Sequence, residues 1–197
     1  MTCRDSGLNI RSGLYIYYEM SSTASIDDLI ALSRNRWTLP LLSDTAAHRG
    51  VRFVELLHRL ELPRDSLART LEAATLAGWI KSNPGHGHPL RPEYVLTEEG
   101  QRLAPIACAI QDAQNGLGLS PADMSRWSMP LVRAIDLGNH RFNALSRTLA
   151  PATPRALSQG LRDLVSARLV VRRLVDDYPP SSHYGLTQSG LILARAA

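Results

Sequence analysis

The chain contains an internal repeat, and this repeat limits its possible folds more than any other feature of the sequence. A Trp-centred segment, residues 36–42 (RWTLPLL), returns 90 positions later as residues 126–132 (RWSMPLV). Two further stretches return at nearly the same offset: an Arg-Phe pair (52–53 and 141–142) and a Tyr-x-Leu-Thr-x-x-Gly stretch (94–100 and 184–190). One single-residue gap aligns the two halves. The chain is therefore predicted to be two copies of one module.

The second copy shows the order of elements in a module most clearly. Ser120-Pro121 supplies a helix start signal and Gly138 a stop, and Thr153-Pro154 supplies a second start. The predicted elements are helix 122–137, helix 142–149, a helix from 153–154 onward, strand 169–175, a return strand 183–186 and a helix from 187. Three helices and a hairpin are the layout of a winged helix-turn-helix. The expected fold class is mainly α with small β-hairpin wings (α+β), with two tandem winged helix-turn-helix domains forming an intrachain pseudo-dimer.

These residues also resemble one family of regulators. The Trp-centred helix, the Arg-Phe pair, the third-helix stretch TPRALSQ and the Tyr-x-Leu-Thr-x-x-Gly close are similar to those of HxlR-type transcriptional regulators, most fully from Arg126 to Gly190. Members of that family usually carry one module and pair as homodimers on DNA, whereas this chain has two modules in tandem. The expected domains are an N-terminal extension (1–24), module 1 (25–114), a linker (115–121) and module 2 (122–197).

The third helix of module 2 presents a polar face suited to DNA. Opposite the apolar stripe that begins at Leu157, helical spacing places Arg155, Gln159, Arg162 and Ser166, with Ser158 at the edge. Arg pairs with guanine and Gln with adenine, and both Arg and Ser bind phosphate. A solvated face is the alternative, but seven Arg and one acid between residues 141 and 173 favour DNA. The predicted DNA-binding residues of module 2 are Arg141, Thr153, Arg155, Ser158, Gln159, Arg162, Arg172 and Arg173.

Module 1 differs at the corresponding positions. Its third helix carries Asp65, Arg69, Glu72 and Leu76. Carboxylates are repelled by the phosphate backbone, and an exposed Leu suits a protein contact better than a DNA groove. The wing of module 1 keeps two further predicted DNA contacts, Lys81 and Arg91. Module 1 is therefore expected to have lost most of its base readout while keeping a basic wing.

The pseudo-dimer is expected to form through the terminal helices of the two modules. Two tryptophans and three apolar residues of the helix after the first wing are predicted to be buried: Trp37, Trp127, Leu103, Ile106 and Ile110. The tryptophans suit core or interface packing better than the wall of a ligand pocket. For Arg36 and Arg126, phosphate contact and simple solvent exposure are equally consistent with the sequence.

Charge and composition narrow the function classes. The net charge is +4, and all but one of the 22 cationic residues are Arg, which suits an acidic partner. No apolar run is long enough to cross a bilayer and no secretory leader is recognisable, so a cytoplasmic location is expected. Two cysteines exclude a disulfide framework. His86 and His88 are too few ligands for zinc, and no catalytic set or phosphate loop is present, so no metal, cofactor or enzymatic activity is predicted.

The sequence favours a sequence-specific DNA-binding transcriptional regulator that works mainly through module 2. The alternative is a protein-interaction or ligand-sensing module built on degenerate winged helices with weak DNA affinity. The expected partner is double-stranded DNA. A homodimer of the tandem chain and a small-molecule effector are left open, and no membrane contact is expected.

Overall fold

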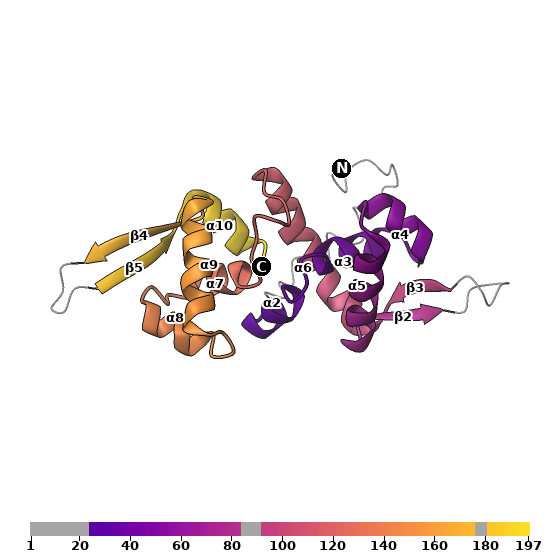
Figure 1. Ribbon diagram of the computed structural model, residues 1–197, viewed down its shortest axis with the longest axis horizontal. Helices are drawn as coiled ribbons and strands as arrows, with labels where there is room; N and C mark the ends of the chain where they lie inside the picture. The colour runs from indigo at the N-terminus through magenta and orange to yellow at the C-terminus, as the bar shows by residue number, and fades with distance from the viewer. Residues whose placement is uncertain (1–23, 84–91, 176–180) are drawn as a thin grey trace.

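The computed structural model describes residues 24–83, 92–175 and 181–197. The N-terminal extension apart from Ala24, the wing residues His86, His88 and Arg91, and residues 176–180 lie outside these ranges. Two helical units, each with a β-hairpin, lie side by side along the long axis of the molecule (Figure 1). No helix in the described ranges is long and apolar enough to cross a membrane.

Module 1 is built from helices packed beside a three-stranded antiparallel sheet. Its elements are α2 (Ile26–Leu32), α3 (Thr38–Ala47), β1 (Val51–Arg52), α4 (Phe53–Leu60), α5 (Arg64–Leu76), β2 (Ile80–Asn83), β3 (Glu93–Leu96) and α6 (Glu98–Gly116). The strand order is β1-β3-β2, with Val51 opposite Tyr94 and Ile80 opposite Leu96. The sheet joins the start of α4 to the hairpin that follows α5, so the helix-turn-helix and the wing form one unit.

Module 2 repeats this order with a smaller sheet. Its elements are α7 (Ser128–Asp136), α8 (Phe142–Thr148), α9 (Pro154–Ser166), β4 (Val170–Val175), β5 (Ser181–Leu186) and α10 (Gln188–Arg195). β4 and β5 pair antiparallel, and a single bridge from Arg141 to His183 stands where module 1 has β1. The predicted short helix, third helix, hairpin and closing helix are confirmed.

The Tyr-x-Leu-Thr-x-x-Gly close has the same physical role in both modules. The hydroxyls of Thr97 and Thr187 cap α6 and α10 by accepting from the amides of Gly100 and Gly190, each at 3.1 Å. A Cβ on Gly100 would lie 2.0 Å from the carbonyl oxygen of Trp79, and one on Gly190 would lie 2.2 Å from that of Leu169. Only glycine lets the closing helix approach the start of the hairpin this closely, which explains why the repeat keeps it.

Two sequence predictions need correction: the start of the first helix of module 2 and the burial of Trp37. The helix expected from Ala122 begins at Ser128, because Ser120 donates its amide and hydroxyl to the Asp123 carboxylate and closes an isolated turn. The chain then restarts, and the amide of Ser125 donates to the Ser128 hydroxyl at 2.9 Å. Trp37 is only half-buried, whereas Trp127 is 8% exposed. The second tryptophan fills the core, while the first lies at its edge.

The modules pack against each other through their terminal helices, as the pseudo-dimer prediction requires. α2 of module 1 contacts α7, and α10 contacts α6; in Figure 1, α2, α6 and the C-terminus occupy the middle while the two wings point to opposite ends. The amide of Ala24 donates to the carbonyl of Ala197. Leu103, Ile106 and Ile110 are buried, and the buried apolar residues of both modules form one continuous cluster. The two modules are therefore joined by a shared core.

Candidate nucleic-acid interface

The third helix of module 2, α9, carries an outward polar face. The Thr153 hydroxyl caps it by accepting from the amide of Ala156 at 3.2 Å, and Pro154 occupies its first turn. Leu157, Leu161 and Leu164 are buried beneath it. The predicted contact residues Arg155, Gln159 and Arg162 are exposed, as is Ser166, while Ser158 is half-buried. The apolar stripe therefore anchors the helix, and the predicted reading residues point into solvent.

Three side chains on α9 are linked by hydrogen bonds along the helix. Arg162 Nη2 donates to Gln159 Oε1 at 2.5 Å, and Gln159 Nε2 donates to Asp163 Oδ1 at 2.8 Å. The amide of Gln159 is thus held between a cation and a carboxylate. These two hydrogen bonds orient the donor and acceptor groups of Gln159. They must break when Gln159 or Arg162 binds another molecule. Asp163 is not among the predicted contact residues, although its i+4 spacing from Gln159 is a sequence signal for this hydrogen bond.

The root of the second wing adds a cluster of basic residues. Arg141 Nε donates to His183 Nε2 at 2.9 Å, and His183 lies opposite Arg173 in the β4–β5 pairing. Residues directly opposite in antiparallel strands share a face, so Arg141, His183 and Arg173 stand together on one side of the hairpin. Sequence reasoning missed His183, because its contact with Arg141 spans 42 residues of chain.

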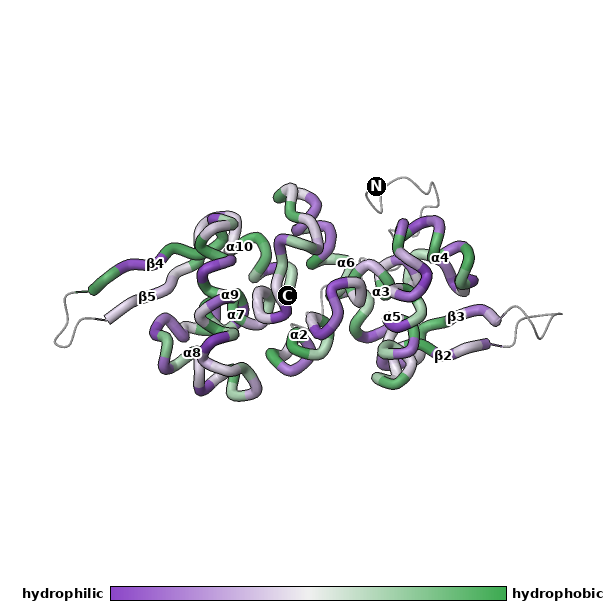
Figure 2. Tube along the Cα trace, in the orientation of Figure 1, coloured by the Kyte–Doolittle hydropathy of each residue, from purple (hydrophilic) through white to green (hydrophobic). Residues whose placement is uncertain are grey.

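The other face of the same hairpin is also held by an arginine. Arg172 donates to the Ser182 hydroxyl from Nε at 3.1 Å and from Nη2 at 2.8 Å. Both Arg172 and Arg173 are exposed, and Figure 2 shows β4 as hydrophilic in its middle and hydrophobic towards its ends. Arg172 therefore lies on one face of the wing and Arg173 on the other.

The corresponding helix of module 1, α5, has the same length but carries acids where α9 has Arg155 and Arg162. Asp65, Arg69, Glu72 and Leu76 are all exposed, Leu76 to 82%. Arg69 Nε donates to the carbonyl of Asp65 at 3.2 Å, so the one cation of this face lies along its own helix between two acids. A helix face of this kind attracts a polyanion poorly.

The first wing is less basic at its root. Arg52 Nη2 lies 3.4 Å from Glu93 Oε1, where module 2 pairs Arg141 with a histidine. Ser82 and Asn83 occupy the positions of Arg172 and Arg173. Lys81, a predicted DNA contact, is exposed on β2, and Arg91 lies outside the described residues. The structure thus gathers the predicted residues of module 2 on α9 and its wing, and leaves Lys81 as the described cation of β2.

Comparison with known proteins adds the family. The family model of the HxlR-like helix-turn-helix matches residues 32–117 and again residues 124–196. An uncharacterised HTH-type transcriptional regulator of Methanothermobacter thermautotrophicus is 29% identical over 83 residues, which are 42% of this chain and 59% of that protein. The chain spans about half the length of the curated relatives it matches.

Solved structures give a looser likeness. A MarR transcriptional regulator of Methanosarcina mazei Go1 is 18% identical with a TM-score of 0.38, covering 55% of this chain and 77% of that one. The wild-type MarR of E. coli is 14% identical with a TM-score of 0.34, covering 81% of this chain and 96% of its own. The two family-model matches, by contrast, coincide with the two structural modules. The chain belongs to the HxlR-like helix-turn-helix family, and it carries the family's module twice.

Proposed function

We propose that this chain is a sequence-specific DNA-binding transcriptional regulator that reads bases mainly through α9 of module 2. The observation that carries the proposal is the outward face of α9, where Arg155, Gln159 and Arg162 stand exposed above a buried leucine stripe. These are the side chains that pair with guanine and adenine edges in the major groove. Arg141, Arg172 and Arg173 supply phosphate contacts beside it, and Thr153 and Ser158 add polar groups at the helix start.

A binding-site selection from a random duplex library tests the proposal. The wild-type chain is expected to enrich one sequence motif, with an affinity that falls steeply as salt rises, because phosphate contacts release counterions. The variant Arg155→Ala/Arg162→Ala is expected to retain its fold and lose the enrichment. The proposal would be refuted if the wild-type chain enriched no motif and bound duplex DNA only below physiological salt.

A second candidate function is favoured by module 1. The outward face of α5 carries Asp65 and Glu72, and Leu76 is 82% exposed at its end. Acidic and apolar groups together suit a protein partner better than a DNA groove. Under this alternative the chain is a protein-interaction or ligand-sensing module with weak DNA affinity, and the selection above separates the two functions.

One reading helix per chain has a consequence for assembly. Specific affinity normally draws on two half-sites spaced by about 34 Å, one turn of DNA. We propose that two tandem chains bind one operator, each placing α9 in a major groove, with Leu76 contributing to the contact between chains. Analytical ultracentrifugation of the complex with a selected duplex should give two chains per site, and a strict one-to-one complex would exclude this arrangement.

A further inference from the structure

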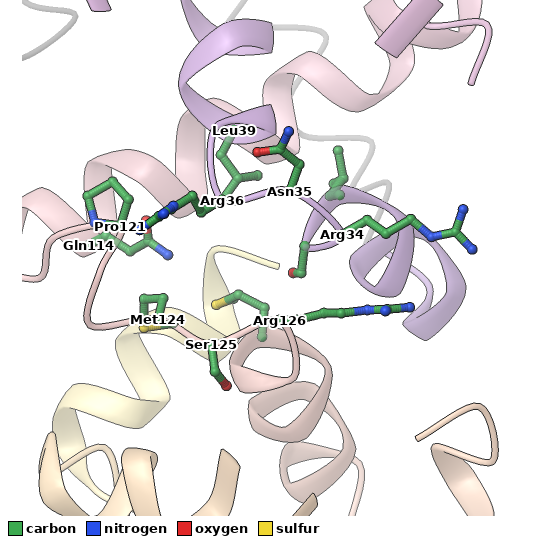
Figure 3. A pocket seen from close by; sticks show the side chains of 12 residues that line it. Arg34, Asn35, Arg36, Leu39, Gln114, Pro121, Met124, Ser125 and Arg126 are labelled. Atoms are coloured by element: carbon green, nitrogen blue, oxygen red, sulfur yellow. The ribbon is translucent and has the colours of Figure 1, made fainter. Parts of the chain in front are cut away.

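A cavity of about 410 Å³ lies where the two modules meet (Figure 3). Its walls come from repeat-related positions: Asn35 and Leu39 before and in α3 correspond to Ser125 and Met129 before and in α7. The end of α6 and the turn after it close one side with Gln114 and Pro121. The cavity therefore exists because the two modules are joined as a pseudo-dimer, and neither module forms it alone. Its volume lies in the range of about 300–1,000 Å³ that is typical of small-molecule sites.

All the charged residues that line this cavity are cationic. Three arginines line it, Arg34, Arg36 and Arg126, and its lining contains no Asp or Glu. Within the described part of the chain, none of the ion pairs involves these three guanidiniums. Several unpaired cations around one concave space repel each other and attract an anion.

Two of these guanidiniums are held in place by aromatic rings. Arg36 stacks over Trp37 at 5.6 Å from the ring centroid, and Arg126 stacks over Trp127 at 5.1 Å. Stacking leaves the N–H edges of a guanidinium available for hydrogen bonds. In Figure 3, Arg36 extends towards Gln114 and Pro121, whereas Arg126 runs beside Arg34. Module 1 thus contributes Arg34 and Arg36 to the lining, and module 2 contributes Arg126.

The remaining lining is amphipathic. Asn35, Gln114 and Ser125 offer amide and hydroxyl groups, and Leu39, Met124 and Met129 offer apolar surface. A bare inorganic ion would leave the apolar walls wet, and a neutral molecule would form no ion pair with the guanidiniums, all three of which are exposed. We propose that this cavity binds a small organic anion with one carboxylate, sulfonate or phosphate group and an apolar body.

The loops that line the cavity contact the inner faces of both third helices. Asn35 Nδ2 donates to the hydroxyl of Thr70, a buried residue of α5, at 2.9 Å. A Cβ added to Gly160 of α9 would meet the Ser125 hydroxyl at 3.6 Å. The loops that line the cavity therefore support the inner faces of α5 and α9, while Arg155 and Arg162 face outward. A ligand that binds one relative placement of the modules better than another would change the spacing of α5 and α9. Such coupling to DNA binding rests on the proposed function, whereas anion binding itself does not.

The probe for this site is 8-anilinonaphthalene-1-sulfonate, an apolar sulfonate that fluoresces in non-aqueous surroundings. Titrated into the folded full chain without DNA, it is expected to saturate at one molecule per chain. Arg36→Gln/Arg126→Gln should weaken binding about ten-fold, because charge-assisted hydrogen bonds to the sulfonate are lost. The matched control Arg155→Gln/Arg162→Gln removes the same charge from an exposed helix face and should bind the probe as the wild type does. The single change Arg34→Gln, at an exposed side chain, serves as a second test and should weaken binding about three-fold.

Equal probe affinity in the wild type, the Arg36/Arg126 pair and the Arg34 variant, or no saturable binding at all, would overturn the proposal. A duplex arm distinguishes a small anion from DNA phosphate as the occupant. If Arg36→Gln/Arg126→Gln lost duplex affinity as strongly as Arg155→Gln/Arg162→Gln did, these arginines would be DNA contacts and the proposal would be wrong. Failure of the proposed function would instead show as absent duplex binding with intact probe binding.

Discussion

The two third helices of this chain share a backbone and differ in surface chemistry. α5 and α9 both have 13 residues and lie 90 positions apart, and each buries leucines at the same places, Leu67 and Leu71 in one and Leu157 and Leu161 in the other. Their outward faces carry acids in module 1 and arginines in module 2. The inner face is fixed by the core, which tolerates few changes. The outer face is fixed only by its partner, so two copies in one chain can keep one fold and take different roles.

The wings show the same division. Both hairpins hold the Thr-x-x-Gly helix cap at their base. At the root, Arg52 forms an ion pair with Glu93, whereas Arg141 donates to the imidazole of His183. The first wing therefore pairs its root arginine with an acid, whereas the second pairs it with a histidine.

The largest expected effect concerns what the modules share. Gly100→Ala and Gly190→Ala each force a Cβ against a backbone carbonyl, at 2.0 Å and 2.2 Å before relaxation, so each should lower the free energy of unfolding by about 3 kcal/mol. Urea denaturation measures this change. Gly116→Ala, which meets no atom within 4 Å, is the control. A tolerated Ala at either close-packed site would show that the caps are not equivalent.

The next effect separates the modules. Arg162→Ala should cost about 1–3 kcal/mol of binding free energy on the selected duplex and relax the preference at one base pair. The equivalent change in module 1, Glu72→Ala, should leave the affinity unchanged or slightly raise it, because it removes a repelling charge. Fluorescence anisotropy at fixed salt gives both numbers. Similar losses for the two variants would mean that both helices read bases.

A charge reversal sharpens the comparison further. Asp65→Arg/Glu72→Arg makes the outer face of α5 basic and should raise affinity for unrelated duplexes. Each new phosphate contact should steepen the slope of log affinity against log salt by about 0.9. A salt titration on an unselected duplex measures this slope, with Asp65→Ala/Glu72→Ala as the uncharged control. An unchanged slope would place α5 away from the DNA.

The smallest effect concerns an ion cluster that module 1 has and module 2 lacks. Arg102 of α6 contacts Asp28 of α2 at 2.6 Å and Glu99 at 2.7 Å, whereas Ile192 stands at the equivalent position of α10. Arg102→Met should therefore lower the free energy of unfolding at neutral pH by about 0.5–1 kcal/mol, as is usual for partly exposed pairs.

The cost of that change should depend on pH. The hydrogen bond from Arg102 holds the pKa of the Asp28 carboxyl below its ordinary value of 3.8 and lowers the pKa of Glu99. A depressed carboxyl pKa stabilises the fold at pH values above the ordinary one and stops doing so as the pH falls through the folded-state value. The wild type and the variant should therefore converge in acid, and a difference that persists there would assign the loss to packing instead.

Much of this architecture could be predicted from local sequence signals. The start and the buried face of α9 follow from Thr153-Pro154 and the leucine spacing, because an N-cap and an apolar stripe act within one helix. The same kind of signal failed at Ser120-Pro121, where the cap residues close a turn that does not continue. Local start signals do not reveal how far a helix extends when tertiary packing takes over.

The features that sequence missed are those that depend on distant parts of the chain. Arg141 was predicted as a DNA contact, but its partner His183 is brought to it by strand pairing. For Arg36 and Arg126 the sequence allows either phosphate contact or simple solvent exposure, because the surroundings of both side chains depend on how the modules pack. The cavity between them exists only in the assembled pseudo-dimer, and a repeat in the sequence gives no angle or distance between its copies.

The central claim is that module 2 reads bases and module 1 does not. Parallel binding-site selections with three chains test it most directly: the wild type, Asp65→Ala/Glu72→Ala in α5, and Arg155→Ala/Arg162→Ala in α9, each with an unchanged unfolding midpoint. The account predicts that the wild type and the α5 variant enrich the same motif, and that the α9 variant enriches none. An α5 variant that loses or alters the motif, or an α9 variant that keeps it, would contradict the account.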